Sequence, residues 1–216
     1  MLAVPRSQVV FRLAVRAGVS RRFGGAAGIH RPMPDTQEKA QLMTASEIDR
    51  TLVRLAHEVL EKTHDLTNLA FIGIRRRGVP LAERLAAKIK TLEDIDVPVG
   101  TLDISFYRDD LSTSGPAPEV RPSPLPFSVT GKDVILTDDV LYTGRTTRAA
   151  LDALFDQGRP ARVQLLVLID RGHRELPIEA RYVGRMVQTT NNEIIEVKFQ
   201  EIDGMEKVLL VERVKE

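Results

Sequence analysis

The stretch from residue 134 to residue 147 constrains the fold of this chain more than any other part of the sequence. It begins with a short apolar run, preceded by residues 131–133, that has the pattern of a buried central strand. Two adjacent carboxylates, Asp138 and Asp139, close that run, and a loop rich in Thr and Gly follows them. From residue 148 to residue 156 apolar side chains return at helical spacing. The order predicts a strand, an acidic pair, a loop and a helix.

That order has a chemical reason. A helix N-terminus presents unpaired N–H groups and the positive end of the helix dipole, and a Gly-containing loop lets the backbone wrap around an anion. Thr hydroxyls can donate hydrogen bonds to phosphate oxygens, while carboxylates at a strand end accept hydrogen bonds from a vicinal diol. Both features suit a phosphorylated sugar such as ribose 5-phosphate. The alternative interpretation is an ordinary strand, turn and helix in which the acidic pair is a solvated cap. The Gly spacing matches neither a nucleoside triphosphatase loop nor a dinucleotide-binding fold.

A second candidate anion site follows an earlier apolar run, residues 69–74. Arg75, Arg76 and Arg77 stand there on a tight turn that ends at Gly78. Guanidinium groups match phosphate oxygens bidentately, so three of them at a strand end make a strong anion site. A solvated turn with no ligand is the alternative.

Length and composition limit the classes of protein that remain. The chain has 216 residues, which is enough for one α/β domain with a substantial core. It contains no Cys, which excludes disulfides and thiol catalysis, and its four His residues lack metal-ligand spacing. No apolar run approaches the roughly 20 residues that span a bilayer.

The net charge of +1 conceals an uneven distribution along the chain. Residues 1–34 carry six Arg and no acidic residue, so the rest of the chain is net negative. We expect residues 1–42 to be a disordered extension, or the product of a reading frame whose true start is Met33 or Met43; an organellar transit peptide is the alternative. Residues 43–216 are then a single domain.

The patterns after Met43 alternate between helices and strands. Thr44 and Glu47 have the spacing of a capping box, and apolar residues recur at helical intervals as far as Leu60. Another helix is predicted at residues 80–90, and strands at residues 69–74, 97–104, 134–137 and 163–169. The alternation predicts an α/β fold with a doubly wound, mainly parallel sheet and flanking helices. Residues 193–199 and 208–212 read as added strands, which we expect to form a small β-rich hood.

Residues 134–147 resemble the phosphoribosyl diphosphate (PRPP) motif of type I phosphoribosyltransferases. The resemblance implies transfer of a phosphoribosyl group at the anomeric carbon of PRPP, with Mg²⁺ bound through PRPP and no dedicated protein cage for the metal. The acidic pair would bind the ribose hydroxyls. The loop that would hold the 5′-phosphate comprises Thr143, Gly144, Arg145, Thr146 and Thr147. The groups that would face the diphosphate are Arg75, Arg76, Arg77 and, from a long loop that closes over PRPP in this family, Arg108. The family commonly has a small residue where this chain has Arg76. The whole matching motif comprises Val134, Ile135, Leu136, Thr137, Asp138, Asp139, Val140, Leu141, Tyr142, Thr143, Gly144, Arg145 and Thr146.

Three strings narrow the resemblance, namely residues 105–111, 138–146 and 170–177. Together they are similar to the PyrR family of bifunctional pyrimidine operon regulators and uracil phosphoribosyltransferases, over about residues 48–214. The acceptor would then be uracil and the products UMP and diphosphate. Asp170 and Arg171 follow the last core strand, where this fold builds its base pocket, so they are the candidates for the uracil side. A simple pairing of Arg171 with Glu175 across a turn is the alternative.

The same resemblance implies a regulatory activity. Members of the family bind the leader of pyrimidine operon mRNA, and UMP or UTP favours that binding and so promotes transcription attenuation. RNA binding requires a local basic surface even where the net charge is negative. The chain departs from the family at Val53, often Thr, and at Glu179, often basic. The RNA candidates are Arg54, His57, Lys62, His173, Arg174, Arg185 and Thr189, with a packing role as the alternative for His57.

Three hypotheses therefore stand together. The first is a PRPP-dependent uracil transferase, the second an RNA-binding attenuator with little catalysis, and the third a PRPP-dependent transferase for another base. The resemblance also implies a homodimer or a higher homo-oligomer. We expect a cytoplasmic protein without membrane contact.

Overall fold

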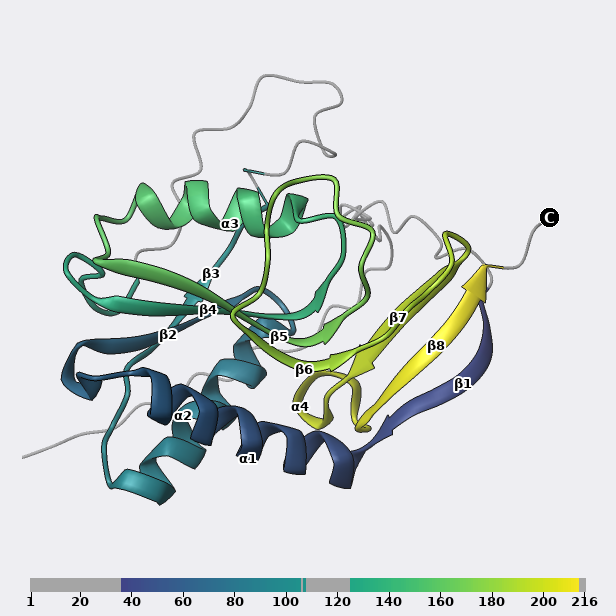
Figure 1. Cartoon of the computed structure of the whole chain (residues 1–216), viewed down its shortest axis with the longest axis horizontal. Coiled ribbons are helices and arrows are strands. Elements are labelled where there is room, and N and C mark those ends of the chain that lie inside the picture. The colour runs from purple at the N-terminus through teal and green to yellow at the C-terminus, as the bar shows by residue number, and fades with distance from the viewer. Residues whose placement is uncertain (1–35, 106, 108–124, 214–216) are drawn as a thin grey trace, which may run out of the picture. The chain divides into compact units, whose positions relative to one another are not determined.

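A five-stranded parallel sheet is the frame of the domain. The computed structural model describes residues 36–105, 107 and 125–213. Five strands pair in parallel in the order β3-β2-β4-β5-β6 (Figure 1). Their bounds are β2 Leu69–Ile74, β3 Val99–Leu102, β4 Asp133–Leu141, β5 Arg162–Asp170 and β6 Tyr182–Met186. The predicted doubly wound α/β fold is confirmed, and β6 adds a strand at one edge.

Helices cover both faces of this sheet. α1 (Ala45–Lys62) and α2 (Gly78–Glu93) lie on one face and α3 (Arg145–Phe155) lies on the other (Figure 1). Alternate strand residues supply the two cores, since Phe71 packs in the cluster that includes α1 and α2, whereas Ile72 packs in the cluster that includes α3. Burial of both faces explains why the core strands read as continuous apolar runs.

The strand order reverses direction at β2. From β2 the chain passes through α2 to β3 on one side, and it then crosses to β4 on the other side of β2. In open α/β sheets, such a switch point leaves a crevice outside the carboxyl ends of the two strands, where ligands bind. Here those ends lead into the Arg turn of residues 75–77 and into the loop of residues 142–144.

A second, antiparallel sheet has the order β1-β8-β7. β7 (Glu193–Lys198) and β8 (Lys207–Arg213) correspond to the two added strands predicted from the sequence. β1 (Thr36–Thr44) was not predicted; it pairs with β8, so the domain begins before Met43. β1 escaped the sequence analysis because it is a polar edge strand in which only Met43 is buried. Residues 1–35 lie outside the described part of the chain.

The predicted capping box is present where β1 passes into α1. The Thr44 hydroxyl accepts a hydrogen bond from Glu47 N at 3.3 Å, and the Glu47 carboxylate accepts one from Thr44 N at 2.8 Å. The Thr44 hydroxyl also donates to the Glu47 carboxylate at 2.8 Å, and the two bonds that Thr44 donates to this carboxylate lower the pKa of Glu47. Two short helical segments, η1 (Leu66–Asn68) and α4 (Gln200–Asp203), complete the described elements. None of the described helices is long and apolar enough to cross a membrane.

Candidate active site

The first turn of α2 lies in close contact with β4. A Cβ atom on Gly78 would lie 2.2 Å from the carbonyl oxygen of Thr137, so only Gly permits this approach. The Thr137 hydroxyl, which is buried, donates a hydrogen bond to the carbonyl oxygen of Gly78 at 2.8 Å. Thr137 directly precedes Asp138, and Arg77 directly precedes Gly78. The contact therefore holds the Arg turn beside the acidic pair.

Asp138 and Asp139 lie inside β4, whereas the sequence pattern placed them after the strand. β4 continues to pair with β5 as far as Leu141, opposite Asp170. Asp138 is buried, and its carboxylate accepts a hydrogen bond from Asp139 N at 2.9 Å. Burial raises the pKa of Asp139, against the opposing effects of the hydrogen bond with Asp138 and the charge of Arg77. The strand thus holds two partly desolvated carboxylates, which can accept hydrogen bonds from a diol.

The loop after β4 has its carbonyl groups engaged by a later segment of the chain. The carbonyl oxygen of Leu141 accepts a hydrogen bond from Arg171 N at 3.1 Å, and that of Tyr142 accepts one from Arg174 Nη1 at 2.8 Å. The carbonyl oxygen of Thr143 accepts two, from Glu175 N at 3.0 Å and from Leu176 N at 3.2 Å. Engagement of the carbonyls fixes the orientation of the peptide groups in the loop.

Helix α3 begins at Arg145, three residues earlier than predicted, and its N-cap Gly144 has φ 92° and no side chain to cap the helix. The first intrahelical hydrogen bond runs from Arg148 N to Gly144 O at 2.9 Å. The N–H groups of Thr146 and Thr147 precede that bond and point out of the helix end, where an anion can accept from them.

The three side chains of the Arg turn differ in their surroundings. Arg75 forms an ion pair with Asp103 at 3.0 Å, and Arg76 is exposed. Arg77 Nη2 donates to Asp203 Oδ1 at 2.8 Å, whereas Arg77 Nε is buried without a hydrogen-bond partner among the described residues. The Arg75–Arg76 peptide bond is cis. Arg108 lies outside the described residues.

Asp170, the last residue of β5, and Arg171, which follows it, are both buried, and the alternative pairing of Arg171 with Glu175 is wrong. Glu175 pairs with Arg145 at 2.6 Å, and Asp170 pairs with Arg174 at 2.5 Å. The Arg171 guanidinium instead lies 4.1 Å from the centroid of the Tyr142 ring.

Hydrogen bonds from Arg171 join this stacked pair to the segment that enters β7. Its Nη2 donates to the carbonyl oxygens of Thr190 and Glu193 at 3.2 and 2.8 Å, and its Nε donates to the Thr189 hydroxyl at 3.0 Å. Arg171 thereby connects the loop after β4 with the start of the hood.

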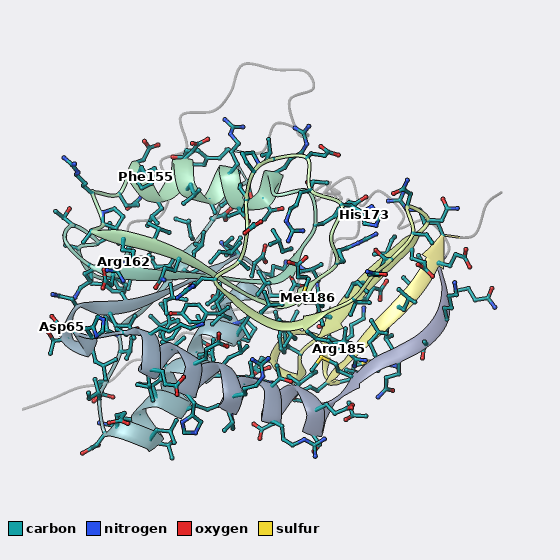
Figure 2. The ribbon with its side chains drawn as sticks, in the orientation of Figure 1. Asp65, Phe155, Arg162, His173, Arg185 and Met186 are labelled. Atoms are coloured by element: carbon teal, nitrogen blue, oxygen red, sulfur yellow. The ribbon has the colours of Figure 1, made fainter. Side chains whose placement is uncertain are left out.

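The candidate RNA residues fall into two groups rather than one, and Figure 2 labels one member of each, Arg185 and His173. Arg54 and Arg185 line a surface hollow of about 310 Å³ between α1 and β6, together with Arg50, which the sequence analysis missed. His57 and Lys62 lie further along α1; His57 is exposed, so a packing role is wrong for it. The other group surrounds the turn after β5, where His173 Nε2 lies 2.6 Å from Thr189 O.

Several of these candidates already hold the fold together. Arg54 donates to the carbonyl oxygens of Val183 and Gly184 at 3.0 and 2.7 Å, and Arg185 donates to Leu42 O. Arg174 binds the carbonyl oxygens of Tyr142, Gly172 and Ile178 in addition to Asp170. Arg174 is therefore tied to the loop after β4, which no spacing in the sequence could indicate.

Comparison with known proteins agrees with this geometry. A family model described as a phosphoribosyl transferase domain matches residues 41–202. A protein of Pelotomaculum thermopropionicum named Bifunctional protein PyrR is 58% identical over 176 residues, which are 82% of this chain and 97% of the relative. The protein of that name from Thermus thermophilus is 55% identical over 175 residues, which are 81% of this chain and 97% of the relative. The chain belongs to the PyrR family.

Solved structures agree with the fold. A hypoxanthine phosphoribosyltransferase from Staphylococcus aureus has a TM-score of 0.61 and 21% identity, covering 80% of this chain and 92% of that one. The corresponding enzyme from Trypanosoma cruzi has a TM-score of 0.63 and 20% identity, covering 81% and 95%. At these identities the similarity concerns the fold alone. Membership of the PyrR family makes this chain a PRPP-dependent phosphoribosyltransferase.

Replacing Asp139 by Asn tests the electrostatic balance in β4. The folded-state pKa of Asp139 is raised, so the ionised carboxylate destabilises the folded protein at neutral pH. The protonated carboxyl stabilises the folded protein at low pH, and this stabilisation is lost as the pH rises through the folded-state pKa. We expect Asp139→Asn to raise Tm at pH 7 by a few degrees, and the gain to shrink as the pH falls. PRPP affinity should fall by about tenfold or more, because a charged acceptor is lost.

Calorimetric melting over a pH series and titration with PRPP measure both effects. Asp133→Asn, at the opposite end of β4, removes the same charge and should leave PRPP affinity unchanged. A lower Tm for Asp139→Asn than for the wild type at pH 7 would contradict this account.

Proposed function

We propose that this chain transfers the phosphoribosyl group of PRPP to uracil, releasing UMP and diphosphate. One observation carries the proposal, namely that three kinds of group lie at the ends of β2 and β4, which are paired neighbours in the sheet. The N–H groups of Thr146 and Thr147 can receive the 5′-phosphate, the acidic pair in β4 can receive the ribose hydroxyls, and the Arg turn can receive the diphosphate. These are the three parts of PRPP.

The chemistry follows from those positions. Uracil N1 forms a bond to the anomeric carbon while the bond from that carbon to the diphosphate oxygen breaks, and the bonding electrons leave with the diphosphate. The proton on N1 passes to solvent water. The sugar passes through a state with oxocarbenium character, which the negative charge of Asp138 and Asp139 would stabilise. Arg75 and Arg77 would stabilise the charge that develops on the diphosphate. The reaction needs no protein nucleophile.

Mg²⁺ fits this site as a companion of PRPP. Among the described residues, no group of three or more His, Asp or Glu side chains could hold a metal ion alone. Mg²⁺ prefers oxygen ligands and is commonly bound by one or two carboxylates together with substrate phosphates, which Asp138, Asp139 and PRPP provide. Bound there, the ion would neutralise charge on the departing diphosphate.

The uracil side is assigned to Arg171 and the turn that begins at Asp170. Arg171 is 6% exposed, and desolvation lowers its pKa. It has no carboxylate partner in the described part of the chain, and none of its hydrogen bonds uses Nη1. A buried cation with an unused donor favours an acceptor such as a base carbonyl oxygen. Asp170, whose carboxylate binds Arg174 and Gly172 N, supports the turn.

A panel of bases tests the acceptor. Purified protein with PRPP and Mg²⁺ should form UMP from uracil, and little or no nucleotide from orotate, hypoxanthine or adenine. Chromatography of the products measures the nucleotide formed from each base. Asp138→Asn combined with Asp139→Asn should lower the rate at least about a hundredfold, because transition-state charge stabilisation is removed.

Two other outcomes of this panel would overturn the assignment. Preference for a purine would make the chain a transferase for another base. A wild type no more active than the doubly substituted protein would leave an RNA-binding attenuator with little catalysis.

We further propose that the chain regulates pyrimidine operons by binding their leader mRNA when UMP or UTP is present. The hollow between α1 and β6 supports this activity, because Arg50, Arg54 and Arg185 line it. Phosphate contacts by such cations supply most of the affinity for RNA and make it salt-dependent. The negative charge of Glu47, which also lines the hollow, offsets one of these cations.

Arg50 is the cleanest test of that surface, because Arg54, Arg174 and Arg185 also bind backbone carbonyls. We expect Arg50→Gln to weaken UMP-dependent binding of a pyrimidine leader hairpin, and to reduce the slope of log K against log salt by about 0.7 to 0.9 if one phosphate contact is lost. Filter binding at several salt concentrations measures both quantities. Arg162→Gln, at the start of β5, is the matched charge control and should bind as the wild type does. Equal loss in both variants would refute this surface.

A further inference from the structure

The guanidinium group of Arg77 lies between two carboxylates from distant parts of the chain. Its Nη2 donates to Asp203 Oδ1 at 2.8 Å, and its positive charge acts on Asp139 in β4. Its Nε is buried and has no hydrogen-bond partner among the described residues. A buried donor without an acceptor is costly, so this atom is poised to bind an acceptor that enters the crevice.

The Asp203 carboxylate is held in a defined place. Its Oδ2 accepts a hydrogen bond from Phe199 N at 3.0 Å, while Oδ1 faces Arg77. Phe199 is fully buried, which anchors the start of α4 in the core. Each oxygen of Asp203 therefore has one partner, and the carboxylate is oriented before any ligand binds.

A second arginine, Arg84 of α2, also binds α4. Arg84 donates to Glu201 at 2.8 Å and to Glu206 at 2.5 Å, and its guanidinium lies 5.2 Å from the centroid of the Phe199 ring. Arg77 and Arg84 are seven residues apart, about two turns, so they lie along one side of the helix start. This contact fixes α4 independently of Asp203, and a change at Asp203 need not undock it.

We propose that Asp203 is a positioning residue for the transfer, which acts through Arg77 and thereby on the diphosphate of PRPP. Asp203 holds one arm of the Arg77 guanidinium, so the plane of the group is fixed and its other nitrogen atoms keep their places. Without this partner, Arg77 can pair with Asp139, because opposite charges attract strongly where water is excluded. That pairing would misplace the diphosphate donor and occupy the carboxylate assigned to the ribose hydroxyls. The inference rests on the proposed use of Arg77 for diphosphate.

Three ligands, PRPP, diphosphate and UMP, differ in whether they carry the group that Arg77 would bind. PRPP and diphosphate carry the group that Arg77 would bind, whereas UMP carries only the 5′-phosphate, the ribose and the base. A defect at Asp203 should therefore weaken the first two ligands and spare UMP. General damage to the site would weaken all three.

Asp203→Asn provides the test, with Glu201→Gln as the matched control. This control removes the same charge from the same short helix, while Glu206 still binds Arg84 and keeps α4 in place. For Asp203→Asn we expect KM for PRPP and Kd for diphosphate with Mg²⁺ to rise about tenfold, as for one weakened charge-assisted hydrogen bond. Kd for UMP should remain unchanged. Glu201→Gln should behave as the wild type in all three measurements.

Two further measurements keep the result decisive. If Asp203→Asn fails to fold, Asp203→Glu, which keeps the charge but moves it by one methylene, should show a smaller rise in Kd for diphosphate and an unchanged Kd for UMP. In an Arg77→Gln background, Asp203→Asn should add no further loss, because the two residues act as a unit. Equal effects of Asp203→Asn and Glu201→Gln, additive losses, or a parallel loss of UMP affinity would overturn the proposal. Diphosphate binding is measured without turnover, so a wild type that forms no UMP would refute the proposed function alone.

Discussion

The contact between Gly78 and Thr137 is the constraint on which the site depends. It brings the first turn of α2 so close to β4 that no side chain fits between them, and the buried Thr137 hydroxyl bridges the two elements at 2.8 Å. The switch point in strand order places the ends of β2 and β4 side by side, but topology alone would leave the distance between them open. Close packing sets that distance, and it brings the cationic turn of residues 75–77 close to the acidic pair in β4.

A second constraint comes from the segment that follows β5. Backbone N–H groups and the Arg174 side chain bind the carbonyl groups of residues 141–143, which orients the loop that leads into α3. The same segment carries Arg171 against the Tyr142 ring and His173 at its edge, with ring centroids 5.9 Å apart for Tyr142 and His173. The loop that is proposed to hold phosphate, the base side and one group of RNA candidates are therefore one connected structure. Because the rings of Tyr142 and His173 are in contact, a ligand that reordered the loop would also move His173, which is one of the proposed RNA residues.

Local patterns were enough to predict most of the fold. The core strands are apolar and buried on both faces, and Thr44 with Glu47 marks the start of α1, so the parallel sheet and its helices could be read from the sequence. The missing pieces depend on partners far along the chain. β1 is polar and is defined by β8, and Asp203 is an ordinary acidic residue until Arg77 is found beside it. Arg174 likewise reads as a basic surface residue although its donors are used inside the protein. Spacing cannot reveal such roles, because they arise from tertiary contacts.

The central claim is that the crevice between the ends of β2 and β4 binds PRPP in one orientation. A crystal structure with Mg²⁺ and a PRPP analogue that cannot react measures this most directly. The account predicts the 5′-phosphate on the N–H groups of Thr146 and Thr147, the ribose hydroxyls on Asp138 and Asp139, and the diphosphate on Arg77. A ligand bound in the reverse direction, or one whose diphosphate makes no contact with the turn of residues 75–77, would contradict it.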